Sequence, residues 1–239
     1  MTGAAGAIGS AIVDGLREQA EHVVAQDVDA SALQQRHGAA HTVTTDGDLG
    51  HSGYRRALAD LCRANTVDTV ILAHGVDGAG PLHQLDDQRV RRVMGINATA
   101  VVALTQDLMP QLRERGGVVV IVDSQAGLQS EPNLAAYCGA KFALVGWARR
   151  LAPALAVDGV RLRLLCPGCT RTPLLLAAFG RFAEAAGESL DEALARRVSN
   201  IPVGRMAEVE ETAAAAIYLA DRSAPRPSIL AATGGEVLL

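Results

Sequence analysis

Three residues, Ser124, Tyr137 and Lys141, have the types and the spacing needed to move a proton beside a carbonyl group. If residues 133–157 form a helix, Tyr137 and Lys141 lie one turn apart on the same face. A phenol has a pKa near 10, but a neighbouring ammonium favours the phenolate and draws that pKa toward the working range. A serine hydroxyl can hold the substrate oxygen. The trio therefore suits protonation of the alkoxide that forms when a hydride reaches a ketone, although a Tyr-x-x-x-Lys pair alone is common on ordinary helices.

The apolar run 117–122 (GVVVIV) is followed by Asp123 and Ser124 and is typical of a strand buried on both faces of a parallel sheet. Further strands are predicted at 22–26, 41–45, 67–73, 160–166 and 236–239. Helices are predicted at 10–19, 53–64, 86–112 (as two helices that meet near 95–97), 133–157, 189–198 and 209–219. This alternation predicts an α/β fold of the Rossmann type, a doubly wound parallel sheet in three layers, as one domain over residues 1–239. Ser124 then lies at the carboxyl edge of a central strand, where such sheets bind ligands.

A glycine-rich turn, residues 2–9 (TGAAGAIG), opens the chain and leads into a helix. Glycines let the backbone approach a pyrophosphate, and the helix N-terminus offers free N–H groups. Asp27 ends the next strand about 20 residues on, where a dinucleotide fold places an acid on the ribose hydroxyls. A carboxylate there repels a 2′-phosphate, so Asp27 favours NAD over NADP. Asp46 follows the next strand and is placed either to accept from the adenine amino group or to serve as a turn residue.

The strand that normally precedes such a turn has no room before Thr2. Three explanations are open: the sequence is trimmed at its ends, its start is misassigned, or residues 236–239 (EVLL) take the vacant place as a permuted strand. Trimming requires the least distortion. Permutation would require a strand at the sheet edge to reach the centre through a very short connector.

Composition narrows the class of protein. Of the 239 residues 49% are hydrophobic and only 3% aromatic, so the core must be aliphatic. The net charge of −4 without a Lys/Arg run argues against nucleic-acid binding. We see neither a leader segment nor an apolar stretch long enough to span a membrane, and therefore expect a cytoplasmic protein. Cys166 and Cys169 form a C-x-x-C spacing, but a zinc site would need a second ligand pair, and two ordinary cysteines are the better interpretation.

Together these motifs resemble the short-chain dehydrogenase/reductase family over essentially the whole length. Residues 2–9 resemble the family's TGxxxGxG turn, with Ala7 at the middle glycine position. Residues 73–75 (AHG) resemble the NNAG segment, with both asparagines replaced. Ser124 and the YCGAK segment match the catalytic spacing, and residues 166–173 (CPGCTRTP) resemble the PGxxxTP loop that closes on the nicotinamide.

The resemblance implies that Tyr137 is the general acid/base, that Lys141 binds the nicotinamide ribose and lowers the tyrosine pKa, and that Ser124 positions the substrate oxygen. Asn97 matches the family's helix-kink asparagine, whose backbone holds a water of the proton relay. Thr172 would bond the carboxamide. The full set expected at the NAD cofactor is Thr2, Gly3, Ala7, Ile8, Asp27, Asp46, Ala73, Gly75, Tyr137, Lys141, Pro167, Gly168, Thr170 and Thr172.

Residues 172–200 are expected to form a lid over the substrate. Its apolar residues at helical spacing either line the substrate pocket or pack the lid onto the domain or a partner subunit; they are Leu174, Leu175, Leu176, Phe179 and Phe182. The expected pocket walls near Tyr137 carry no fixed charge; they are His74, Gln125, Ala126 and Leu134. We therefore expect a small neutral alcohol or ketone, apolar or cyclic, unless Arg171 or Arg181 reaches inward.

The resemblance also implies a homotetramer, or a homodimer, through helices around 101–108 and 144–155. The main alternative is an NAD-binding regulator that kept the fold and lost catalysis; the intact Asn97, Ser124, Tyr137 and Lys141 set argues against it. A sugar-nucleotide epimerase or dehydratase would need a longer segment after Lys141. A metal-dependent alcohol dehydrogenase would need a Cys/His cluster that we do not find.

Overall fold

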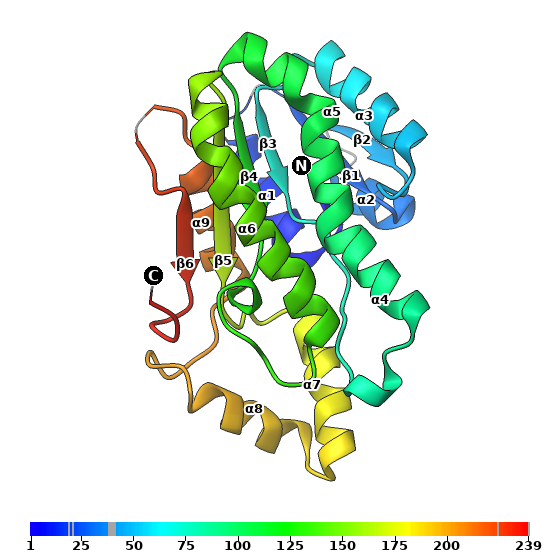
Figure 1. Cartoon of the computed structure of the whole chain (residues 1–239), viewed down its shortest axis with the longest axis vertical. Helices are drawn as coiled ribbons and strands as arrows, with labels where there is room; N and C mark the ends of the chain where they lie inside the picture. The colour runs from blue at the N-terminus through cyan, green and yellow to red at the C-terminus, as the bar shows by residue number, and fades with distance from the viewer. Residues whose placement is uncertain (19, 21, 38–41, 224, 239) are drawn as a thin grey trace.

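The computed structural model describes residues 1–18, 20, 22–37, 42–223 and 225–238. Its parallel strands run in the order β2-β1 and then β3-β4-β5-β6 (Figure 1). Their bounds are β1 (Val23–Asp27), β2 (Thr42–Asp46), β3 (Thr69–Leu72), β4 (Val118–Val122), β5 (Arg161–Pro167) and β6 (Ile229–Ala232). The first five confirm the strands predicted from apolar runs; His41, the first residue of one predicted strand, lies outside the described residues.

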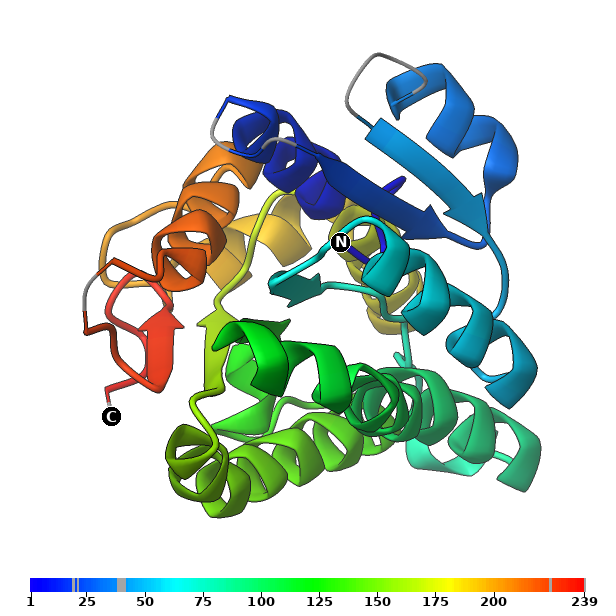
Figure 2. The same ribbon diagram turned by 90° about the horizontal axis from the view of Figure 1, so that it is seen from above.

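Helices cover both faces of the sheet, which gives the three layers of a Rossmann-type fold (Figure 2). One face carries α1 (Ala7–Arg17), α2 (Ala30–His37) and α9 (Val209–Ala220). The other face carries α3 (Ser52–Ala64), α5 (Ala100–Arg115) and α6 (Ala135–Val157). The core between the layers is aliphatic, as the composition predicts; Leu104, Leu144 and Leu164 are fully buried.

The long helical stretch after residue 86 is divided as predicted. It forms α4 (Asp87–Met94), a π-helical turn (Gly95–Thr99) and α5. A π turn breaks the regular i→i−4 hydrogen-bond ladder and is often found at functional sites. Asn97 lies in this turn and is fully buried.

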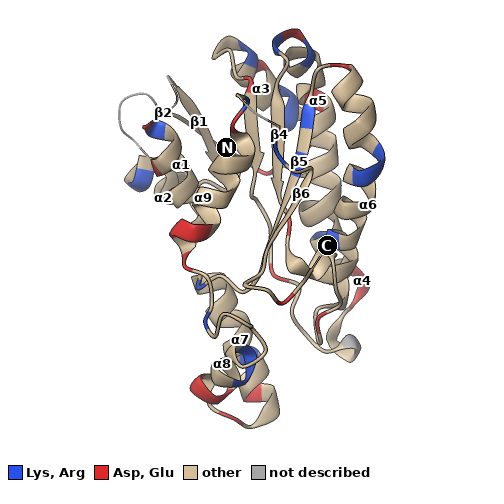
Figure 3. Ribbon diagram, turned by 90° about the vertical axis from the view of Figure 1, so that its left-hand side faces the viewer, with Lys and Arg blue, Asp and Glu red and all other residues tan. Residues whose placement is uncertain are grey.

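Two helices, α7 (Pro173–Ala186) and α8 (Leu190–Val198), stand apart from the three layers (Figure 3). Thr172 caps α7, because its Oγ1 accepts a hydrogen bond from the Leu175 amide at 3.2 Å. Ser189 and Glu192 form a reciprocal capping box that begins α8. The segment predicted as a lid thus consists of two short, well-capped helices.

Met1 and Thr2 connect β1 with β3 through backbone hydrogen bonds. Thr2 forms isolated parallel bridges to Gln26 of β1 and to Leu72 of β3. Its amide donates to the Ile71 carbonyl at 3.0 Å, and the Gln26 amide donates to the Met1 carbonyl at 2.9 Å.

The prediction that EVLL forms a strand is wrong, and so is the idea that it fills the central position. Residues 236–238 lie in a loop after β6, and the Val237 amide donates to Thr233 Oγ1 at 3.0 Å. Gly234 and Gly235, with φ of 65° and 89°, turn the chain away from the sheet. The last strand is β6, which the sequence reading missed; Leu239 lies outside the described residues.

Candidate active site

Ser124 is held at the carboxyl end of β4. Its Oγ accepts a hydrogen bond from the Ala126 amide at 3.1 Å, which caps a short 3-10 helix (Gln125–Gly127). An acceptor role toward the backbone leaves the hydroxyl proton of Ser124 able to donate to another oxygen. The side chain lines a cavity of about 490 Å³, which we call the main cavity.

Tyr137 lies on the first turns of α6 and lines the same main cavity as Ser124. Lys141 lies one turn later and is only 4% exposed. Its Nζ is 5.6 Å from the centre of the Tyr137 ring. The structure therefore brings together the three residues that the spacing singled out, with the hydroxyl and the phenol at the cavity and the ammonium behind them.

The sequence reading missed the counter-ion of Lys141, which is Asp123. Lys141 Nζ lies 3.6 Å from Asp123 Oδ1 and donates to the Val122 carbonyl at 3.2 Å. Burial raises the pKa of Asp123 to about 6, although Lys141 opposes the shift. Burial by itself would lower the pKa of Lys141, but Tyr137 and Asp123 outweigh it and raise that pKa. Lys141 is thus held as an ammonium in a dry setting.

Asn97 does not line the main cavity. Its side chain instead braces the loop after β3: Oδ1 accepts from the Val76 amide at 2.8 Å, and Nδ2 donates to the Val76 carbonyl at 2.9 Å. Gly75 passes so close that an added Cβ would lie 3.0 Å from Asn97 Oδ1. The carboxamide ties the π turn to the segment that follows Ala73, so Asn97 has a structural task that the sequence did not reveal.

The glycine turn brings the backbone into contact at two places. A Cβ on Gly9 would lie 1.9 Å from the Gly3 carbonyl oxygen, and a Cβ on Gly3 (φ 69°) would lie 2.8 Å from Ala73. Gly6 is the N-cap of α1 and provides no side-chain cap. No side chain therefore caps the N–H groups of the first turn, which include those of Ala7 and Ile8. These groups are left able to donate hydrogen bonds to an anion.

Asp27 faces the glycine turn. Its Oδ2 accepts from the Ala5 amide at 2.9 Å and its Oδ1 from the Val28 amide at 2.7 Å. Asp29, by contrast, accepts from the Ala32 amide at 2.9 Å and so caps α2. Asp29, and not Asp27, therefore caps α2. Asp46 lies beside Asp27 in the β1–β2 register and is exposed.

The prediction that His74 forms a wall of the substrate pocket is wrong, since His74 does not line the main cavity. Its Nδ1 is 2.7 Å from Thr2 Oγ1, a contact that links the loop after β3 to the glycine turn. Burial, together with the charge of Lys141, lowers the pKa of His74 to about 3. The imidazole is therefore neutral in the folded protein and replaces an asparagine of the family pattern as a neutral brace.

The end of β5 and the loop after it contribute Pro167, Gly168, Thr170 and Thr172 to the main cavity. Thr170 Oγ1 lies 2.9 Å from Thr212 Oγ1 of α9, so this loop is also anchored to the opposite layer. Ile8 of α1 lines the same cavity. One cavity thus joins the start of α1, the loop after β5 and the Ser124–Tyr137 pair.

The lid helices close the main cavity with apolar side chains. Leu174, Leu175, Phe179 and Phe182 line it, whereas Leu176 does not. The rings of Phe179 and Phe182 meet edge to face, with centres 5.8 Å apart. Gln125, Ala126 and Leu134 also line the cavity, as expected from the sequence.

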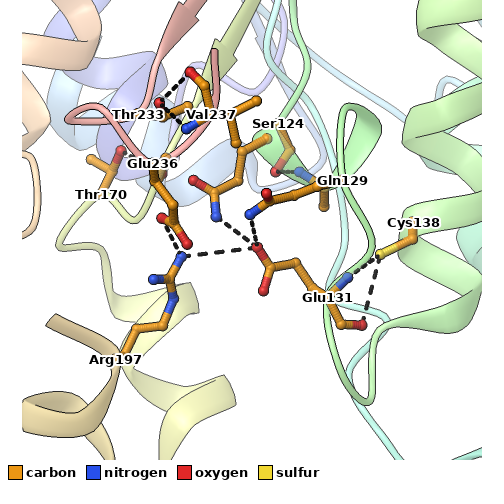
Figure 4. A network of polar contacts seen from close by, with 12 residues as sticks. Ser124, Gln129, Glu131, Cys138, Thr170, Arg197, Thr233, Glu236 and Val237 are labelled. Carbon is orange, nitrogen blue, oxygen red and sulfur yellow. Dashed lines mark hydrogen bonds and ion pairs between the residues drawn. The ribbon is translucent and has the colours of Figure 1, made fainter. Parts of the chain in front are cut away.

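The arginines near the main cavity are paired with carboxylates. Arg171 lies 3.9 Å from Glu208, and Arg181 pairs with Asp77. Arg197 Nη2 lies 2.7 Å from Glu236 Oε2 and 3.9 Å from Glu131 Oε1 (Figure 4). Each of these three guanidinium groups is therefore paired with a carboxylate.

The four cysteines are free thiols: Cys62, Cys138, Cys166 and Cys169. Burial raises the pKa of Cys166 to about 12 and that of Cys169 to about 11. A thiol with such a pKa stays protonated near neutral pH and is a poor nucleophile or metal ligand. Across the residues that the structure describes, His, Cys, Asp and Glu side chains form no group of three or more that could hold a metal ion.

The helices in the same described ranges include none long and apolar enough to cross a membrane.

Comparison with known proteins gives three further findings. The family model described as short chain dehydrogenase matches residues 1–179. The 2,5-dichloro-2,5-cyclohexadiene-1,4-diol dehydrogenase of Sphingobium indicum is 30% identical over 250 residues, which cover 98% of this chain and 94% of the relative. A crystal structure of an actinorhodin polyketide ketoreductase variant with NADPH superposes with a TM-score of 0.91 at 26% identity, covering 98% of this chain and 95% of the other.

A further relative is an "inactive" 2-(S)-hydroxypropyl-CoM dehydrogenase of Xanthobacter autotrophicus, 35% identical over 147 residues. That match covers 61% of this chain and 61% of the relative, so it spans less than two thirds of the relative's length.

Proposed function

Because the chain belongs to the short-chain dehydrogenase family, we propose that it is an NAD(H)-dependent oxidoreductase that interconverts a secondary alcohol and a ketone. The observation that carries this proposal is the main cavity, onto which Ser124 and Tyr137 both open while Lys141 lies buried behind the tyrosine. When bound, the nicotinamide supplies or accepts the hydride.

The residues at the start of the chain fit a dinucleotide. Gly3 and Gly9 have no side chain at the points where the backbone of the turn makes close contacts, so no side chain stands in front of the backbone there. The N-terminus of α1 also lacks a side-chain cap. Ala7 and Ile8 would offer N–H groups to the pyrophosphate, and Asp27 would accept from the adenosine ribose. Gly168, Thr170 and Thr172 would contact the nicotinamide half, because they line the main cavity beside Ser124. We propose Thr2, Ala73, Gly75, Asp46 and Pro167 as the remaining contacts.

The chain's own residues would handle the proton. In the reducing direction Ser124 donates a hydrogen bond to the carbonyl oxygen, and Tyr137 gives that oxygen its proton as the carbon receives the hydride. In the oxidising direction the Tyr137 phenolate removes the hydroxyl proton. Lys141 favours the phenolate through its charge, and Asn97 holds the neighbouring loop in place.

We propose a small neutral substrate, apolar or cyclic. The apolar wall of α7 and the pairing of Arg171, Arg181 and Arg197 both support this choice. A cyclic alcohol also agrees with the cyclohexadiene-diol named for the Sphingobium relative.

The test is turnover of NADH with a panel of small ketones, compared with a Tyr137→Phe variant. We expect the wild type to oxidise NADH with at least one ketone. The variant should lose roughly 100- to 10,000-fold in kcat, the usual contribution of a positioned acid, while NADH affinity changes little. If both proteins bind NADH and neither turns over any ketone, the enzyme proposal fails.

A second candidate is an NAD-binding regulator without catalytic activity. The name of the Xanthobacter relative, which calls that protein inactive, is the observation in its favour. The same experiment separates the two candidates, since a regulator would bind NADH without consuming it in either form.

The preference for NAD is tested separately. We expect kcat/KM for NAD to exceed that for NADP by at least tenfold, since Asp27 would repel the 2′-phosphate. Asp27→Ser should narrow this ratio by weakening use of NAD and permitting NADP. A clear preference of the wild type for NADP would contradict the assignment of Asp27.

A further inference from the structure

One wall of the main cavity is polar, although the wall formed by α7 is apolar. We define the polar subsite as Gln125, Glu131, Arg197 and Glu236, all of which line the main cavity. Figure 4 shows the contacts of Arg197 with Glu131 and Glu236. They come from separate segments: the 3-10 helix after β4, the loop before α6, α8 and the segment after β6. The three charged side chains are between 12% and 18% exposed. This polar cluster is assembled from four separate segments of the chain and lies in the same cavity as the apolar side chains of α7.

The carboxamide of Gln125 has a fixed orientation. Its Nε2 donates to Glu131 Oε1 at 2.6 Å, and a carboxylate can accept from an amide nitrogen but not from an amide oxygen. Gln129 donates to the same Glu131 oxygen at 3.3 Å, and Arg197 lies 3.9 Å from it. Glu131 is thereby anchored, and Gln125 Oε1 must point away from it.

Gln125 Oε1 is a buried acceptor that finds no hydrogen-bond donor among the described residues. Gln125 as a whole is only 4% exposed. The oxygen lies beside the loop after β5, because a Cβ on Gly168 would be 2.9 Å from it. A buried acceptor without a donor is costly, so a ligand that brings one is favoured.

The charges of the polar subsite decide which donor fits. Two carboxylates face one guanidinium, so a negative charge remains, and Arg197 is already engaged at 2.7 Å by Glu236. Arg196, the other arginine in the cavity lining, pairs with Glu188. A substrate carboxylate or phosphate would meet Glu131 without an unpaired cation, whereas the Arg197 guanidinium disfavours an ammonium.

We propose that the substrate carries a second hydroxyl group, which donates a hydrogen bond to Gln125 Oε1. The substrate class is then a neutral diol or hydroxyketone rather than a simple alcohol or a hydroxy acid. The inference rests on the proposed function and deepens it: Ser124 and Tyr137 act on one oxygen, and Gln125, held by Glu131, recognises the other.

The test measures binding without turnover. The dead-end complex of Tyr137→Phe with NADH is titrated with cyclohexanone and with 2-, 3- and 4-hydroxycyclohexanone, following NADH fluorescence. We expect at least one hydroxyketone to bind about tenfold more tightly than cyclohexanone, the gain from one buried hydrogen bond. Equal affinity for all four ketones would overturn the inference.

Variants locate the effect. In the same Tyr137→Phe background, Gln125→Leu should reduce the ratio of the two dissociation constants to near one. Gln129→Leu is the matched control, because it also removes a hydrogen bond to Glu131 Oε1 but Gln129 does not line the main cavity. The control should keep the tenfold ratio. If Gln125→Leu keeps it too, Gln125 is not the recognition group and the inference is wrong.

A second variant keeps the test decisive if Gln125→Leu fails to fold. In the Tyr137→Phe complex, 4-oxocyclohexanecarboxylate should bind more weakly than cyclohexanone, and Glu131→Gln should bring the two affinities within about threefold. Tight binding of the carboxylate to the complex with Glu131 intact would overturn the inference.

Turnover by the wild-type enzyme is measured separately. A binding preference without turnover would refute only the proposed function, and turnover without a binding preference would refute only the inference.

Discussion

Lys141 depends on a neighbour that the motif does not include. Asp123 lies beside Ser124 in the sequence, but only the structure shows its carboxylate 3.6 Å from the ammonium with no side-chain exposure. The Asp123 pKa of about 6 places the change in charge of this pair within the working pH range of most enzymes. Above that pH Asp123 is ionised and holds Lys141; below it the attraction is lost.

The first prediction concerns this pair. We expect kcat/KM to fall as the pH drops through about 6 in the wild type, because protonated Asp123 no longer fixes Lys141. Asp123→Asn should be less active above pH 7 and should lack the ionisation near 6. Asp77→Asn is the control, since Asp77 also lines the main cavity but pairs with Arg181. A pH profile of Asp123→Asn that keeps the ionisation near 6 would contradict this role.

The second prediction concerns His74, which is neutral in the folded protein because its pKa is lowered to about 3. Between pH 6.5 and 3 the unfolded chain binds the extra proton, so the free energy of unfolding decreases as the pH falls through that window. From pH 7.5 to 5.5 the wild type should lose about 1 kcal/mol more than His74→Asn. Urea denaturation at both pH values measures the difference; parallel losses would show that His74 does not titrate on unfolding.

Side-chain roles were predictable where spacing alone decides them. Ser124, Tyr137 and Lys141 are separated by short, regular intervals, so the sequence placed them together. Asp123 and Gln125 flank Ser124, yet their partners Lys141 and Glu131 are reached only through the fold. Glu236 could not be anticipated at the cavity, because its position depends on the glycine turn after β6.

Among the elements, the strands buried on both faces were the most predictable. A short continuous apolar run such as that of β4 is rarely found outside a buried strand or a buried helix, and its length favours a strand. β6 is short and half-buried, and it follows a polar segment, so its four residues gave no distinct pattern. EVLL has the composition of a strand, but the two left-handed glycines before it direct the chain elsewhere. The break between α4 and α5 was visible from Gly95, whereas its π geometry was not.

The third prediction concerns the turn before α1. Gly9→Ala should lower the free energy of unfolding by about 2–4 kcal/mol and weaken NADH binding, since its Cβ would collide with the Gly3 carbonyl. Gly53→Ala in α3 is the control, because its Cβ would meet no atom within 4 Å; stability there should be unchanged or slightly higher. Equal behaviour of the two variants in thermal unfolding and NADH titration would contradict the close approach.

For the molecule as a whole, we propose a homotetramer that packs through α5 and α6. Phe142 lies on α6, and its large apolar side chain is 45% exposed. The packing of α6 on the sheet therefore leaves part of its apolar surface uncovered. Phe142→Asp should therefore shift the species seen by light scattering toward the monomer. Val157→Asp, at the end of the same helix and 88% exposed, is the control and should leave the assembly intact. A wild type that is monomeric at micromolar concentration would refute the proposal.

The carboxyl edge of the sheet has a consequence for how a dinucleotide would change the motion of the protein. Asp27 ends β1 and Gly168 follows β5, so NAD bound to both would link distant parts of this edge. In hydrogen–deuterium exchange we therefore expect NAD to slow the exchange of amides near both residues, such as those of Val28 and Thr170. Slower exchange at only one of them would contradict the assignment of the other residue as a cofactor contact. The cofactor would thus act as a cross-link between strands that lie apart in the sheet.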